Sequence, residues 1–76
     1  METLKNIVSR VFNVPANKIN DELARDTIEE WDSFNHLLLI SEVEKEIGIK
    51  FTILEVGKIK TLKELKESIA KKKKSL

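Results

Sequence analysis

Apolar residues recur at helical spacing through most of this chain, and that spacing limits the folds open to it. The first set, three or four positions apart, comprises Leu4, Ile7, Val8, Val11 and Phe12. Such spacing predicts a helix with one apolar face. The helix ends at Asn13-Val14-Pro15, because proline cannot continue the ladder and restricts the residue before it.

A second helix is predicted from Ser33 to Ile47. Asp32 and Ser33 are good N-cap residues, and an apolar run begins directly after them. Gly48 is its predicted left-handed terminator. The apolar positions of this helix form more than one stripe, so it touches neighbours on two sides or exposes an apolar patch.

The rest of the chain predicts two further helices. Ile49, Phe51 and Ile53 alternate like a strand, but a lone short strand has no partner, so a short helix near 53–57 is favoured. Thr61-Leu62-Lys63-Glu64 has the spacing of a capping box. It opens a last helix, whose inward residues are Leu62, Leu65 and Ile69.

Residues 16–31 are predicted to form a long, partly ordered loop. Its sparse apolar anchors are Ile19, Leu23, Ile28 and Trp31. A loop of this length in a small domain tends to be functional. The fold class is therefore all-α: a small four-helix bundle with three longer helices, one short helix and a long loop between the first two. Residues 1–76 are expected to form a single domain with a basic, frayed tail at 71–76.

Composition excludes several classes of function. The 76 residues include no cysteine and one histidine, which argues against disulfides and against Cys- or His-built metal sites. The first residues lack the apolar run of a signal peptide, and no stretch approaches a membrane span. We expect a cytoplasmic monomer without stable membrane insertion.

Charge is unevenly distributed behind a net value of +1. Residues 20–46 carry a net −7, whereas residues 1–19 carry +2 and residues 47–76 carry +6. The acidic zone surrounds Asp32-Ser33, so it steers basic partners there and repels nucleic acid.

The segment Trp31-Asp32-Ser33-Phe34, at the start of an amphipathic helix that ends in Val43-Glu44-Lys45-Glu46-Ile47-Gly48, resembles the acyl carrier protein family. In that family an Asp-Ser-Leu motif opens the second helix, and Phe34 replaces the leucine here. The loop after Val14 and Lys60-Thr61-Leu62 also match, so the resemblance covers essentially the whole chain.

The resemblance implies a carrier and not an enzyme. Ser33 would bear a 4′-phosphopantetheine arm, with Asp32 and Phe34 beside it. A phosphopantetheinyl transferase would attach the arm from coenzyme A with Mg²⁺. Acyl-loading and acyl-transfer enzymes of fatty-acid, polyketide or surface-polysaccharide type pathways would then use the thioester-bound cargo.

The partner surface departs from the family pattern. Asn35, Leu38 and Lys45 stand where fatty-acid carriers are often acidic, and the short helix carries Ile53-Leu54. This suggests a specialised member of the family, and it motivates an alternative in which the cargo is a hydroxyacyl, glyceryl or aminoacyl group and not a growing fatty acid. The candidate partner-binding residues are His36, Leu38, Ser41, Glu42, Lys45, Ile53 and Leu54.

Several residues have plainer interpretations. Ser33 and Asp32 also suit a simple helix cap, and a helical interaction module without a prosthetic group is the rival function. His36 reads as a solvated surface histidine, since a Ser–His catalytic pair lacks its other requirements. Leu38 is either core or a partner contact, and Trp31 is a core anchor in the manner of a hydrophobic staple. The predicted lining of an acyl shelter comprises Phe34, Leu37, Val43, Val56, Ile59 and Leu62.

Overall fold

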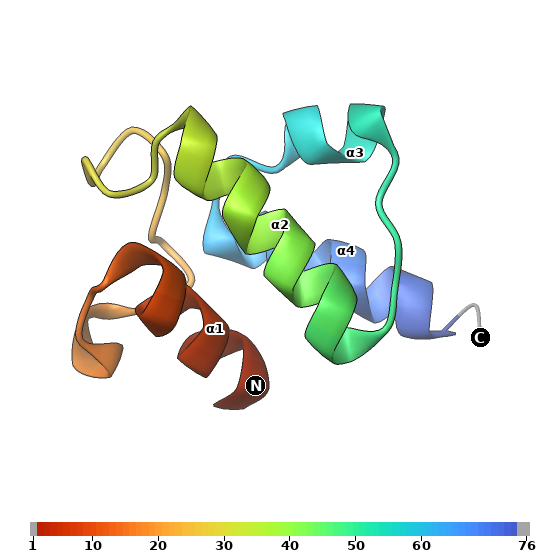
Figure 1. The fold of residues 1–76 in the computed structure, drawn as a ribbon, viewed down its shortest axis with the longest axis horizontal. Coiled ribbons are helices and arrows are strands. Elements are labelled where there is room, and N and C mark those ends of the chain that lie inside the picture. Colours follow the sequence, from red (N-terminus) through yellow and green to blue (C-terminus); the bar gives the residue numbers. More distant parts are fainter. Residues whose placement is uncertain (1, 75–76) are drawn as a thin grey trace.

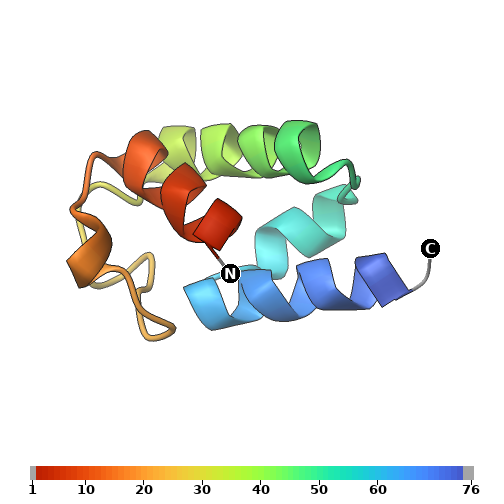
Figure 2. The same cartoon turned by 90° about the horizontal axis from the view of Figure 1, so that it is seen from below.

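The computed structural model describes residues 2–74. Within them the chain forms helices α1 (Glu2–Phe12), α2 (Ser33–Ile47), α3 (Ile53–Lys58) and α4 (Leu62–Lys74), with a 3₁₀ turn at Ala16–Lys18. Helices α2 and α4 run in the same direction and α1 runs against them (Figures 1 and 2). Short α3 lies to one side of α2 in Figure 1 and at a level between α2 and α4 in Figure 2. The predicted all-α four-helix bundle is confirmed.

Local signals set the helix ends. Asn13, with φ of 56°, ends α1 in the left-handed conformation, and the Val14 N–H donates to the Ser9 carbonyl at 3.3 Å. These two features close the helix as a Schellman motif does. Gly48 ends α2 at φ of 80°, and its N–H donates to the Glu44 carbonyl at 3.0 Å. The prediction for Gly48 is confirmed, whereas the stop of α1 lies at Asn13 itself, two residues before the proline.

A capping box opens each of the two helices in the C-terminal half, α3 and α4. The Thr61 and Glu64 side chains each accept the other residue's backbone N–H, at 3.1 and 3.0 Å, as predicted. Thr52 and Glu55 do the same at the start of α3. This second box was not predicted, although Thr52-Ile53-Leu54-Glu55 carries the same signature.

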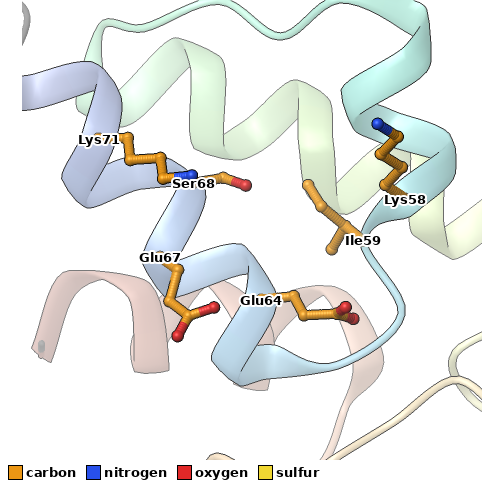
Figure 3. Close-up of a pocket in the computed structure, with 6 residues that line it drawn as sticks. All are labelled: Lys58, Ile59, Glu64, Glu67, Ser68 and Lys71. Carbon is orange, nitrogen blue, oxygen red and sulfur yellow. The ribbon is translucent and has the colours of Figure 1, made fainter.

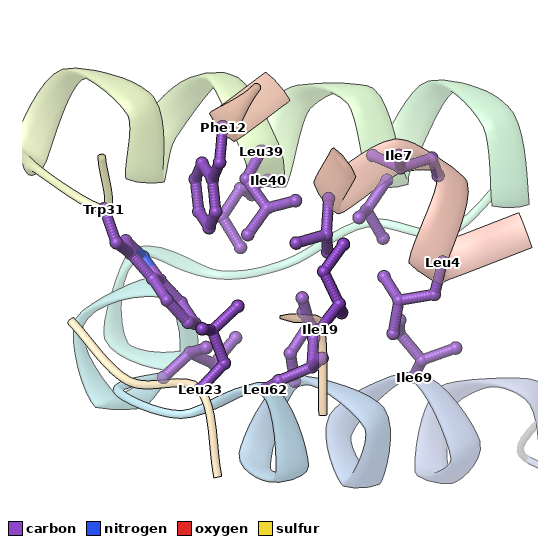
Figure 4. Close-up of a cluster of buried hydrophobic side chains, with 14 of the residues drawn as sticks. Leu4, Ile7, Phe12, Ile19, Leu23, Trp31, Leu39, Ile40, Leu62 and Ile69 are labelled. Carbon is purple, nitrogen blue, oxygen red and sulfur yellow. The ribbon is translucent and has the colours of Figure 1, made fainter. Parts of the chain in front are cut away.

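The core lies between α1, α2 and α4, closed at one end by the long loop (Figure 4). Ile19, Leu23 and Trp31 of the loop are buried, and Ile28 packs against the cluster from a half-buried position. The loop is also joined to the start of α4, because the Leu62 N–H donates to the Leu23 carbonyl at 2.9 Å. The prediction that these apolar anchors pin the long loop to the core is confirmed.

The last turns of α4 differ from the frayed tail predicted for 71–76. The helix is regular through Lys74, and residues 75–76 lie outside the described part of the chain. Lys72 explains the order: its ammonium pairs with Glu55 at 2.8 Å and lies 5.3 Å from the centre of the Phe51 ring. None of the helices within residues 2–74 is long and apolar enough to cross a bilayer.

Candidate functional site around Ser33

Ser33 is the first residue of α2 and is exposed to solvent. Asp32 is the N-cap, and its carboxylate accepts the Asn35 N–H at 2.8 Å. The Asn35 side chain in turn donates to the Glu30 carbonyl at 2.8 Å, which holds the end of the loop against the first turn. The serine therefore lies at a fixed and accessible helix start.

The first backbone amides of α2 are available to an acceptor. Among the described residues, the N–H groups of Ser33 and Phe34 have no hydrogen-bond partner. Such donors at the N-terminus of a helix favour a phosphate oxygen or another anion. An anionic group joined to the Ser33 hydroxyl would lie beside them.

A shallow hollow opens beside the serine. We call it the Ser33 hollow, and its lining comprises Arg25, Asp26, Trp31, Asp32, Ser33 and Lys60. Lys60 is far from Ser33 in the sequence and is brought there by the Arg25 N–H, which donates to the Lys60 carbonyl at 3.0 Å. A second depression, with Thr27, Ile28 and Glu29 in its lining, continues from the hollow along the loop.

His36 is buried and not solvated, with 4% of its surface exposed. The Trp31 indole N–H donates to His36 Nδ1 at 2.9 Å, and His36 Nε2 lies 2.8 Å from the Val56 carbonyl oxygen. Since an indole nitrogen only donates, Nδ1 is the acceptor and Nε2 carries the hydrogen. His36 thus joins the loop, α2 and α3, and the predictions of a solvated and partner-binding side chain are wrong.

The same contact is the staple of α2. Trp31 precedes the N-cap and His36 is the fourth helical residue, the two positions that a hydrophobic staple joins. The Trp31 and His36 rings are stacked, with their centroids 6.2 Å apart. The Phe12 ring packs against Trp31, with a distance of 5.1 Å between the two ring centroids. The prediction for Trp31 is confirmed, with a histidine as its partner.

One face of α2 is exposed and largely apolar. We call it the outer stripe of α2; it consists of Phe34, Leu37, Leu38, Ser41 and Lys45, all exposed. Phe34 is 74% exposed and Leu37 61%, so the prediction that they line an acyl shelter is wrong. His36 takes the inward position with Leu39, Ile40 and Val43 because these four share one helix face. On α3, Ile53 and Leu54 are 91% and 75% exposed.

The remaining predicted lining residues belong to the packed core. Val43, Ile59 and Leu62 are buried, and Val56 is half-buried against the core. A separate hollow between the end of α3 and α4 is bordered by Ile59 and by charged and polar side chains (Figure 3). Its polar border does not suit an acyl chain.

The acids of α2 are held within the molecule. Arg10 pairs with Glu42 at 2.9 Å and with Glu46 at 2.5 Å, and these contacts raise the pKa of Arg10. Glu44 accepts the Phe51 N–H at 2.8 Å. Glu42, which was predicted to bind partners, is thus directed to α1 together with Glu46, and Glu44 is directed to the chain after Gly48.

Comparison with solved structures identifies the fold. It is similar to the solution NMR structure of the holo acyl carrier protein from Geobacter metallireducens, with a TM-score of 0.83 and 31% sequence identity. The match covers 93% of this chain and 82% of that one. No family model matches the chain, and no curated protein matches it. The chain has an acyl-carrier-type helical fold, and at this identity and coverage it belongs to the acyl carrier protein family.

Proposed function

We propose that the protein is a carrier that holds acyl intermediates as thioesters on a 4′-phosphopantetheine arm attached to Ser33. The observation that carries the proposal is the exposed Ser33 at the first position of α2, in a fold similar to that of a holo acyl carrier protein. The arm supplies a thiol at the end of a long tether. A cytoplasmic, monomeric carrier is part of the proposal.

The residues around Ser33 fit such a group. The amides of Ser33 and Phe34 are free to receive a phosphate oxygen, and Asp32 is engaged in capping. No activating base for the serine is needed in this chain, because a phosphopantetheinyl transferase would provide it. The chain would therefore present its serine and take no catalytic part.

Partner enzymes would bind the outer stripe of α2. The acids of α2 are engaged with Arg10 and with the Phe51 N–H, so the face of α2 that follows Ser33 is largely apolar. Leu38 is 39% exposed, and together with Ile53 and Leu54 it would contact an apolar patch on a partner. Enzymes whose basic patches recognise an acidic helix of the carrier would bind this surface poorly.

This surface favours a specialised carrier, whose cargo would be a hydroxyacyl, glyceryl or aminoacyl group. Loading assays with purified fatty-acid synthase enzymes test this part separately. We expect slow malonyl transfer and little elongation. Efficient elongation would contradict the specialised assignment and leave the carrier function intact.

The attachment of the arm is tested by intact-mass measurement. The protein is incubated with coenzyme A, Mg²⁺ and a broad-specificity phosphopantetheinyl transferase. We expect the wild type and Ser68→Ala, a matched serine on α4, to gain one phosphopantetheine, and Ser33→Ala to gain none. No gain in the wild type would instead favour a helical interaction module without a prosthetic group.

A further inference from the structure

Two cations of the Ser33 hollow have no assigned role. The structure describes ion pairs for Arg10, Lys66 and Lys72, but among residues 2–74 neither Arg25 nor Lys60 forms one. Their side chains also make no hydrogen bond to the described residues, so folding does not use these charges. Both border the same hollow as the serine.

Their position is unusual in the charge pattern of the chain. Residues 20–46 hold nine acids and two cations, Arg25 and Lys45. The loop exposes Asp26, Glu29 and Glu30 close to Ser33 in the sequence. A phosphodiester on Ser33 would carry one more negative charge into this acidic zone, where like charges repel it.

We infer that Arg25 and Lys60 bind the phosphodiester of the arm and direct the arm over the loop, away from the outer stripe of α2. This inference rests on the proposed function. A guanidinium and an ammonium are the side chains best suited to a phosphate oxygen. Asp26 and Asp32 border the hollow too, but Asp32 is held as the N-cap and neither forms an ion pair with the two cations.

The backbone keeps the two cations together. The hydrogen bond from the Arg25 N–H to the Lys60 carbonyl lies beside the bridge that joins Ala24 and Thr61. The Lys60 N–H is itself held by the Glu64 carboxylate at 2.9 Å. Both main chains are fixed in this way, so both side chains start from the border of the hollow that contains Ser33.

The arm could leave Ser33 along either of two paths. In one, the phosphodiester contacts Arg25 and Lys60, and the arm starts along the depression that includes Thr27 and Ile28. In the other, the acids of the loop repel it and the arm starts over Phe34 and Leu37. The first path leaves the outer stripe of α2 open to a partner enzyme.

Nuclear magnetic resonance of the holo protein tests the contact without any partner enzyme. Wild type, Arg25→Gln, Lys60→Gln, the double variant and the control Lys18→Gln are each converted and checked by intact mass. The ³¹P shift is then compared with that of the same protein unfolded in urea, and the Arg25 Nε–H shift is compared between apo and holo forms. An exposed charge contact of this kind changes the ratio of bound to free phosphodiester by about 1.4- to 5-fold.

We expect the ³¹P shift of the wild type and of Lys18→Gln to differ from the unfolded value, and that difference to shrink in each single variant and vanish in the double variant. The Arg25 Nε–H resonance should move on conversion, and the movement should decrease with added salt. A double variant with the wild-type ³¹P shift, or an unmoved Arg25 resonance, would overturn the inference while the carrier function stands. Failure of the wild type to convert would instead overturn the proposed function.

Discussion

Replacing His36 by leucine removes the acceptor of the Trp31 indole and the donor to the Val56 carbonyl. Leucine fills much of the same buried space, so the change acts mainly on these two hydrogen bonds. A buried donor or acceptor without a partner costs about 1–3 kcal/mol. The indole is fully buried and the carbonyl only partly, so we expect a total loss of about 2–4 kcal/mol.

That loss is a large share of the stability of a small domain. At roughly 0.05–0.15 kcal/mol per residue, a chain of this length is stable by about 4–11 kcal/mol. Urea unfolding followed by far-ultraviolet circular dichroism measures the change. With a urea slope of about 1 kcal/mol/M, the midpoint of His36→Leu should fall by about 2 M or more.

A double-mutant cycle with Trp31→Phe isolates the pair. Phenylalanine has no indole N–H to leave unpaired, so the double variant should be less destabilised than the sum of the two single variants by about 1–2 kcal/mol. Surface substitutions ordinarily change the free energy of unfolding by about 0.5 kcal/mol or less. A change of that size in His36→Leu would refute the buried hydrogen-bond network. Additive single effects would refute the Trp31–His36 coupling.

Three further predictions concern other parts of the molecule. Gly48→Ala should lose about 1–2 kcal/mol because alanine is strained at φ of 80°, whereas Gly57→Ala should gain roughly 0.5–1 kcal/mol within α3; thermal melts would show the opposite signs, and equal effects would contradict the backbone argument. The hydrogen bond from Lys72 lowers the pKa of Glu55 below its usual 4.5, so its stabilisation is complete above that pH and is lost as the pH falls through the lowered value. Glu55→Gln should therefore flatten the acid limb of a stability–pH curve, and an unchanged limb would disagree. Leu38→Asp should keep the wild-type melting temperature but weaken transfer by a cognate acyl-transfer enzyme, and unchanged transfer would remove Leu38 from the partner surface.

The helix limits were predictable because their signals are local. Asp32, Gly48 and the Thr61–Glu64 box each act within a few residues of themselves, so the limits of α2 and the start of α4 follow from the sequence. The exposed place of Ser33 follows from the same signals.

The parts that were missed depend on distant or reciprocal contacts. Polarity suggested that His36 faces water and Leu37 the core, but the buried Trp31 indole needs an acceptor and His36 lies five residues further on. Residues 36, 39, 40 and 43 share one face of the helix, and residues 34, 37, 38, 41 and 45 share another. The helical spacing of the sequence allows either face to point to the core. No local pattern places Lys60 beside Ser33, since that depends on pairing between the loop and the start of α4.

The central claim, that the arm is carried by Ser33, is tested most directly by locating the modification on one residue. Trypsin cleavage after Arg25 and Lys45 releases residues 26–45, which contain Thr27, Ser33 and Ser41 as hydroxyl residues. Fragmentation of this peptide from the converted protein should place the entire mass gain on Ser33. A gain on Thr27 or Ser41, or an unmodified peptide from a protein that has gained mass, would contradict the claim.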